Sequence, residues 1–229
     1  MVYARTLGDG TYTFQVSGRL WRNNLIMEDR ETGTLWSQMT GRAIDGAHRG
    51  SQLQRLEAVQ TTWERWRTAH PDTRVLKKKE EVVGSPYQRY FDDPDRMGMF
   101  RAQWLADRMP GKALVFGATL GSHALAVTEG ALDGTGSVVA ELGGVPVVLA
   151  RGPEGGVRGF AARVEGEVIE LFRDPATGKV VDDSGSTWDL TTVRCIAGPR
   201  IGARLEPIAV SPSYWFAWSS IYPNTQIID

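Results

Sequence analysis

Hydrophobic and polar residues alternate with a period of two along much of the chain, which is typical of half-buried strands. Residues 11–16 and 168–172 are two examples, and each run follows a glycine that can close a hairpin. Turn dipeptides recur between such runs, for example Asp9-Gly10 and Gly143-Gly144. Short strands with tight turns favour antiparallel sheets, because parallel strands need long crossovers. The pattern predicts a mostly β protein with a few short helices.

The clearest predicted helix covers residues 62–69. Trp63 and Trp66 lie three positions apart on one face, Thr61 is the expected N-cap, and the proline after His70 ends the helix.

A second helix of the same kind is expected near the C-terminus. Ser211 would cap it and Pro212 would occupy its first turn, where proline is tolerated. Trp215 and Trp218 would form its apolar face before Pro223 stops it. A third, amphipathic segment is expected at residues 100–109.

Residues 33–76 match residues 185–228 at a constant offset of 152, with 12 of 44 positions identical. About three identities would be expected by chance, so we interpret the match as an internal duplication. Six of the eight tryptophans fall in matched pairs, namely Trp36 with Trp188, Trp63 with Trp215 and Trp66 with Trp218. The sequence thus predicts two related lobes, each with small antiparallel sheets followed by a tryptophan-bearing helix.

The duplication divides the chain into a first lobe (residues 1–83), a linker with aromatic anchors (84–110) and a second lobe (111–229). About 50 residues of predicted strand, Lys112 to Phe160, precede the second duplicated block, whereas only the hairpin that starts at Met1 precedes the first. We therefore expect the first lobe to be incomplete at its N-terminal side and to expose strand edges. A second copy of the chain would cover them, giving a homodimer.

Several stretches of the chain, in order, resemble one prokaryotic family, domain-of-unknown-function family 3179. The stretches are residues 10–18, 25–38, 69–76, 92–96, 143–148, 186–189 and 214–218. The resemblance extends over nearly the whole chain and implies a duplicated, mostly β protein with no assigned activity.

This sequence departs from the family pattern at its start. Similar members carry a Cys-Pro-x-Cys-Gly element and an upstream histidine just before the segment equivalent to Val2-Tyr3-Ala4-Arg5, and both are missing here. Residues 150–156, the corresponding stretch of the second lobe, contain no cysteine either. Thiol, redox or metal chemistry suggested by that element is therefore not transferred to this chain.

The composition of the chain indicates which classes of partner and which cellular location are expected. The net charge is −1, from 26 basic and 27 acidic residues, which does not favour nucleic-acid binding. No apolar run approaches the roughly 20 residues of a membrane span. Arg5 and Asp9 interrupt any signal-peptide core, so the chain as written is expected in the cytoplasm; export stays open if the true start lies upstream of Met1. Cys195 is the single cysteine and is expected in the core.

The candidate ligand-binding residues surround two tryptophans. Asp29, Arg30, Glu31, Ser37 and Gln38 form the densest polar group beside Trp36. At the constant offset Arg30 aligns with Asp182, and Gln38 aligns with the apolar Leu190. A position that is polar in only one of the two copies is where a ligand site confined to that lobe is expected. Trp188 and Asp189 are the candidates in the second lobe. The simpler interpretation, which we favour, is that Trp36 and Trp188 fill cores and that the polar group is a solvated hairpin. The same core role is expected for the helix tryptophans Trp63, Trp66, Trp215 and Trp218.

No motif of an enzyme, a nucleotide site or a metal site is present, and His48, His70 and His123 lack ligand spacing. No catalytic residue, metal ligand or cofactor is assigned. The leading hypothesis is a non-catalytic binding or scaffold protein. The alternative is an enzyme or metal-dependent protein of unrecognised type, with its site in the inter-lobe cleft near residues 29–38.

Overall fold

A computed structural model describes residues 1–76, 84–85, 87–98, 108–134, 136–152, 154–190 and 192–229. Strands dominate the described residues, and most belong to small antiparallel sheets, which confirms the predicted fold class. The names first lobe and second lobe are kept for residues 1–83 and 111–229.

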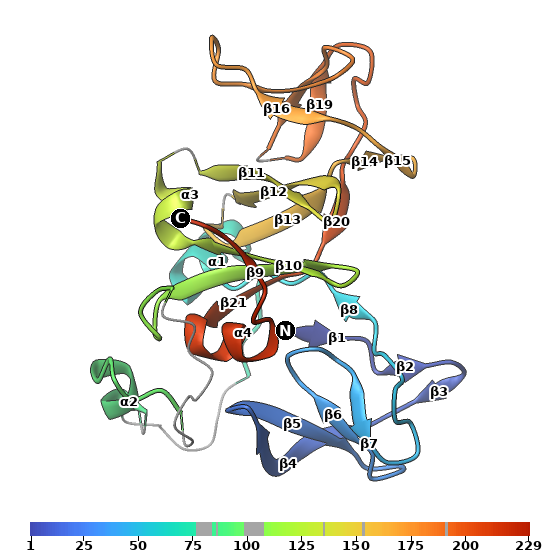
Figure 1. The fold of residues 1–229 in the computed structure, drawn as a ribbon, viewed down its shortest axis with the longest axis vertical. Helices are drawn as coiled ribbons and strands as arrows, with labels where there is room; N and C mark the ends of the chain where they lie inside the picture. The colour runs from blue at the N-terminus through green and yellow to red at the C-terminus, as the bar shows by residue number, and fades with distance from the viewer. Residues whose placement is uncertain (77–83, 86, 99–107, 135, 153, 191) are drawn as a thin grey trace.

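Two four-stranded sheets form the centre of the second lobe (Figure 1). The first has the order β21-β9-β10-β22, with bounds Val210–Tyr214, Leu114–Leu120, His123–Thr128 and Gln226–Ile228. The second has the order β11-β12-β13-β20, with bounds Ser137–Leu142, Val145–Arg151, Val157–Ala161 and Glu206–Ile208. Their strands pair antiparallel, except that β10 and β22 are parallel.

Strand β12 is buried on both faces. Its Val147 and Leu149 pack into a core shared with β9 and β10, whereas Val148 and Ala150 pack on the opposite side with Trp188 and other residues of the outer sheet. Successive side chains of a strand point to opposite faces, so a continuous apolar run fills two cores at once.

That outer sheet has the order β16-β17-β18-β19, with bounds Leu171–Arg173, Val180–Asp182, Thr187–Asp189 and Arg194–Ala197. The hairpin β14 (Arg163–Val164) and β15 (Glu167–Val168) lies beside it. Cys195 is buried here, as predicted. The run predicted as one strand over residues 168–172 is therefore interrupted between β15 and β16.

The first lobe contains another four-stranded sheet with sequential strand order, β4-β5-β6-β7, at the opposite end of the molecule from the outer sheet (Figure 1). Its bounds are Phe14–Trp21, Asn24–Asp29, Leu35–Ser37 and Ala43–Asp45. Two short ladders flank it: β1 (Val2–Tyr3) with β8 (Arg55–Leu56), and β2 (Thr6–Leu7) with β3 (Gly10–Thr11). Its buried cluster of Trp36, Ala43 and Leu53 is small.

Both tryptophan helices form, and their starts differ from the predictions by one to a few residues. Helix α1 is Trp63–Ala69, and its N-cap is Thr62 rather than Thr61, because Thr62 Oγ1 accepts the Arg65 N–H at 3.4 Å. Helix α4 is Trp215–Ile221. Pro212 lies in β21 instead of in the helix, since β21 is an edge strand, where a missing N–H is tolerated.

The remaining helices are α2 (Gln88–Asp92), in the linker, and α3 (Glu129–Asp133), between β10 and β11. The helix predicted at residues 100–109 lies mostly outside the described residues. Within the part of the chain that the structure describes, no helix is both long and apolar enough to cross a membrane.

Only one of the two helices buries its tryptophans. Trp215 and Trp218 of α4 are 0% exposed and form a core with Met39, Val115 and Ala126. The prediction that Trp63 and Trp66 also fill a core is wrong, because they are 50% and 36% exposed.

Candidate functional site

Asp29, at the end of β5, is fully buried beside Trp36. Its Oδ2 accepts the Trp36 Nε1–H at 2.8 Å, and its Oδ1 accepts the N–H and the hydroxyl of Thr32, each at 2.7 Å. Both carboxylate oxygens are thus engaged in closing the turn between β5 and β6. This arrangement anchors an indole; it does not present a carboxylate to a ligand.

The second lobe contains the same arrangement around Asp182. Its Oδ2 accepts the Trp188 Nε1–H at 3.0 Å, and its Oδ1 accepts the N–H and the hydroxyl of Ser184 at 2.9 and 2.7 Å. Arg200 adds an ion pair to Asp182 at 3.2 Å. Asp189, the sequence candidate beside Trp188, lies at the other end of β18 and accepts a hydrogen bond from Thr192.

These contacts correct the residue alignment. Asp29, and not Arg30, occupies the place of Asp182, so the turn before Trp36 is one residue longer than the turn before Trp188. The charge difference between Arg30 and Asp182 comes from this misalignment and gives no support for a site in the first lobe.

Both aspartates stay ionised despite burial. Burial by itself raises the pKa of Asp29 and of Asp182, but hydrogen bonds outweigh it and hold each pKa below its usual value. The donors are Trp36 and Thr32 for Asp29, and Ser184, Ser186 and Trp188 for Asp182.

The other predicted residues are not gathered around this pair. Arg30 is exposed on the hairpin, where its Nε donates to Gln15 Oε1 at 3.0 Å. The Gln38 carbonyl accepts the Tyr3 hydroxyl at 2.8 Å. Among the six candidates, Asp29 and Trp36 are hydrogen-bonded to each other, whereas Trp188 and Asp189 belong to the outer sheet of the second lobe.

A cleft of about 710 Å³ lies where the two lobes meet. The first lobe contributes the end of β4 and residues 40–55, and the second lobe contributes the β9–β10 turn and the end of α4. The described residues that line it include two arginines and no aspartate or glutamate: Trp21, Thr40, Arg42, Ile44, Gln52, Leu53, Gln54, Arg55, Thr119, Gly121, Ile221 and Tyr222. Its charge is therefore positive.

Arg55 of β8 is the central cation of this cleft. Its side chain is half-buried and donates to the hydroxyl of Ser211, which belongs to β21 of the second lobe. Among the described residues no carboxylate lies within ion-pair distance of Arg55. Burial raises the pKa of Tyr3 to about 12 and also raises that of Tyr222, while the charge of Arg55 opposes both rises. Both phenols are neutral hydrogen-bond donors near pH 7.

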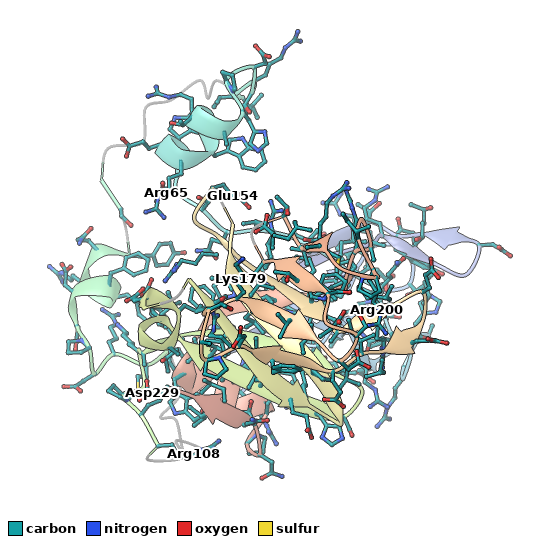
Figure 2. The ribbon with its side chains drawn as sticks, turned by 90° about the horizontal axis from the view of Figure 1, so that it is seen from above. Arg65, Arg108, Glu154, Lys179, Arg200 and Asp229 are labelled. Carbon is teal, nitrogen blue, oxygen red and sulfur yellow. The ribbon has the colours of Figure 1, made fainter. Side chains whose placement is uncertain are left out.

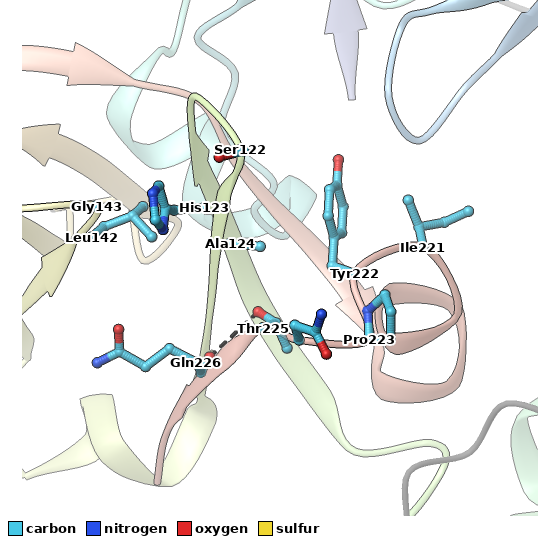
Figure 3. Close-up of a pocket in the computed structure, with 11 residues that line it drawn as sticks. Ser122, His123, Ala124, Leu142, Gly143, Ile221, Tyr222, Pro223, Thr225 and Gln226 are labelled. Atoms are coloured by element: carbon cyan, nitrogen blue, oxygen red, sulfur yellow. Dashed lines mark hydrogen bonds between the residues drawn. The ribbon is translucent and has the colours of Figure 1, made fainter.

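Tyr222 also lines a second, smaller pocket of about 320 Å³ (Figure 3). His123 and Gln226 contribute polar groups there, and Ala124 lies between His123 and Tyr222 in the view shown. His123 covers Gly143 so closely that a Cβ there would come within 2.7 Å of the imidazole Cδ2. No described group of three or more His, Cys, Asp or Glu residues is arranged to hold a metal ion in either pocket or elsewhere.

The sequence reasoning missed Arg55, Trp21 and Tyr222. They come from three separate segments, so no local motif joins them. One signal was present: at the offset of 152, Arg55 stands opposite Pro207, a charged residue facing an apolar one in otherwise related blocks.

Comparison with known families gives one match, and it extends over almost the full chain. The model of the family described as "Protein of unknown function (DUF3179)" matches residues 1–225. No curated protein and no solved structure matches the chain significantly. The resemblance found in the sequence agrees with this match, and the chain belongs to the DUF3179 family.

Proposed function

We propose that this protein is a non-catalytic binding protein that holds a small organic anion in the cleft between its lobes. The observation that carries the proposal is Arg55, a half-buried guanidinium with no carboxylate partner among the described residues. A half-buried cation without a counter-ion has lost part of its hydration, and a ligand carboxylate would offset that loss.

The walls of the cleft suit a flat anion. The guanidinium fork of Arg55 matches the two oxygens of a carboxylate, and Arg42 at the exposed rim adds a second positive charge. The Tyr222 hydroxyl is available as a neutral donor. Trp21 is 39% exposed and offers an aromatic surface, one side of which is already covered by the Arg22 guanidinium at 5.2 Å from the ring centroid. An aromatic carboxylate is the class of ligand that uses all of these groups.

The same contacts favour binding over catalysis. An enzyme needs a base or nucleophile that is accessible to the substrate. Asp29 is buried with both oxygens engaged, and the raised pKa of Tyr222 keeps its phenol protonated. An enzyme site near residues 29–38 therefore stays the weaker proposal.

The test is calorimetric titration with a defined probe, indole-3-acetate, compared with benzoate. We expect saturable binding with one site per chain, and a loss of about tenfold or more in affinity for Arg55→Gln. Arg55→Lys keeps the charge but loses the fork, so we expect an intermediate affinity. Arg49→Gln is the matched control, because Arg49 is exposed and does not line the cleft. Binding of neither probe, or equal binding by the Arg55→Gln protein, would refute the proposal.

A further inference from the structure

Helices α1 and α4 have the same local construction. Each has seven residues, with a tryptophan at positions one and four. Trp66 Nε1 donates to Thr73 Oγ1 at 3.0 Å, and Trp218 Nε1 donates to Thr225 Oγ1 at 3.1 Å. The Trp66 indole packs on His70 at 4.0 Å between ring centroids, and the Trp218 indole packs on Tyr222 at 4.4 Å.

The two helices differ in what covers them. The β9–β10 hairpin covers α4, with Val115 and Ala126 in contact with its tryptophans. Trp218 lies so close to the backbone of Gly117 that a Cβ at this position would come within 2.2 Å of its ring. A small residue on the hairpin is therefore required for the indole to pack flat.

The same hairpin also pairs with the strands on either side of α4. β21 before the helix pairs antiparallel with β9, and β22 after it pairs parallel with β10. The corresponding residues of the first lobe, 58–62 and 74–76, form no strand. Val75 and Leu76, which correspond to Ile227 and Ile228 of β22, are 67% and 89% exposed.

Helix α1 is held at its base and stands away from the rest of the protein (Figure 2). The Thr61 hydroxyl donates to the Glu154 carbonyl. The Arg65 side chain passes over Gly155, and a Cβ added to Gly155 would lie 2.0 Å from Arg65 Nη1. The base is thus fixed on the loop before β13. The tryptophan face is exposed, together with Val75 and Leu76, so it forms an apolar surface on a positioned helix.

We propose that this surface, made of Trp63, Trp66, Val75 and Leu76, is the docking site for a two-stranded antiparallel β-hairpin of a partner polypeptide. The β9–β10 hairpin shows the chemistry that fits: two apolar strands, with glycine or alanine where the indole of Trp66 packs. The partner's strands would pair with residues 58–62 and 74–76 and bury both tryptophans, as β9 and β10 do for α4.

A second copy of the chain does not meet this requirement. Its own β9–β10 hairpin is enclosed between two cores, one shared with β12 and the other with α4. Leu125 and Val127 face the first core and Ala126 faces the second. Donating the hairpin to another chain would open both cores of the donor, so the homodimer expected from the sequence is less favourable than a separate partner.

The experiment uses a hairpin probe made from residues 115–128 of this chain, cyclised through a D-proline-glycine turn because isolated hairpins are marginally stable. The probe is titrated into the full chain, and tryptophan fluorescence and acrylamide quenching are recorded. We expect saturable 1:1 binding, a blue shift and reduced quenching. A Gly117→Val probe should bind about tenfold more weakly or worse, because its side chain meets the indole.

Variants of the chain show whether the probe binds at α1. Trp66→Ser should weaken probe binding about tenfold or more, whereas Phe172→Ser, which removes an exposed aromatic side chain of the outer sheet, should leave it unchanged. Thermal unfolding of each variant checks that it is folded.

Two results would overturn the proposal. One is a monomeric chain, by light scattering, that does not bind the probe or binds it equally well after Trp66→Ser. The other is a dimer that Trp66→Ser converts to a monomer, because a second copy then occupies the surface. Neither result bears on anion binding at Arg55.

Discussion

Two buried aspartates hold Trp36 in the sheet β4-β5-β6-β7 and Trp188 in the outer sheet. Asp29 and Asp182 each accept an indole N–H together with the donors of the following turn. A charged acceptor strengthens such a bond, and removal of one partner leaves the other buried and unsatisfied. Asp29 and Asp182 therefore stabilise the sheets that contain Trp36 and Trp188.

The pH dependence of unfolding tests this role. Because the folded-state pKa of both aspartates lies below the usual 3.8, their contribution is present above pH 3.8 and is lost as the pH falls through the folded values. Asp29→Asn and Asp182→Asn should each lower the free energy of unfolding by about 1–3 kcal/mol at pH 7 and by less in acid.

Urea unfolding between pH 7 and pH 3 gives this comparison. Glu57→Gln, at an exposed position, is the control. If the Asp29→Asn protein lost as much stability on acidification as the unmodified protein, the carboxylate would not be the stabilising group.

The two tryptophan helices have one local construction and two environments. In both α1 and α4 the tryptophans are three positions apart, the second indole donates to a threonine, and an aromatic ring follows the helix, but only α4 has a hairpin packed on it. The stability of such a short helix comes mainly from packing, so equal sequence features give unequal contributions.

Alanine substitution measures the difference. Trp218→Ala removes a fully buried side chain and should cost about 3–5 kcal/mol in the free energy of unfolding. The matched change Trp66→Ala should cost less than about 1 kcal/mol, since the side chain is 36% exposed and belongs to no buried core among the described residues. Chemical denaturation of both variants measures the two losses in the free energy of unfolding. Equal losses would mean that α1 is covered in solution.

The lobes contact each other through a few specific side chains. Met39 of the first lobe packs into the core of Trp215 and Trp218, Arg22 donates to the Ser220 carbonyl, and Asn24 donates to the Ala217 carbonyl at 3.3 Å. This contact also fixes the cleft that holds Arg55 and Tyr222. Ligand binding there would stabilise the contact by mass action.

Met39→Ala tests the contact. The side chain is 2% exposed, so its truncation should cost about 2–5 kcal/mol and should separate the unfolding of the lobes, seen as non-coincident fluorescence and circular dichroism transitions. Leu76→Ala, at an exposed position, should be nearly neutral. A single coincident transition with unchanged stability would show that the lobes do not depend on Met39.

Periodicity and turn residues determined the fold class, because alternation and glycine-containing turns act over a few neighbouring residues. They also located both tryptophan helices, the buried Cys195 and the strands after residue 112. The internal duplication and the division at residues 83 and 110 stay predictions. The likeness of the Asp29 and Asp182 turns supports the duplication as a proposal.

Tertiary structure alone decided which tryptophans are buried and which polar residues meet. Trp66 and Trp218 have the same local pattern, and their exposure differs because β9 and β10 lie next to one of them and not the other. Arg55, Trp21 and Tyr222 form one cleft although they are far apart in sequence, so no spacing could indicate it. Burial and charge pairing depend on contacts between distant segments, and those contacts are fixed only when the lobes pack.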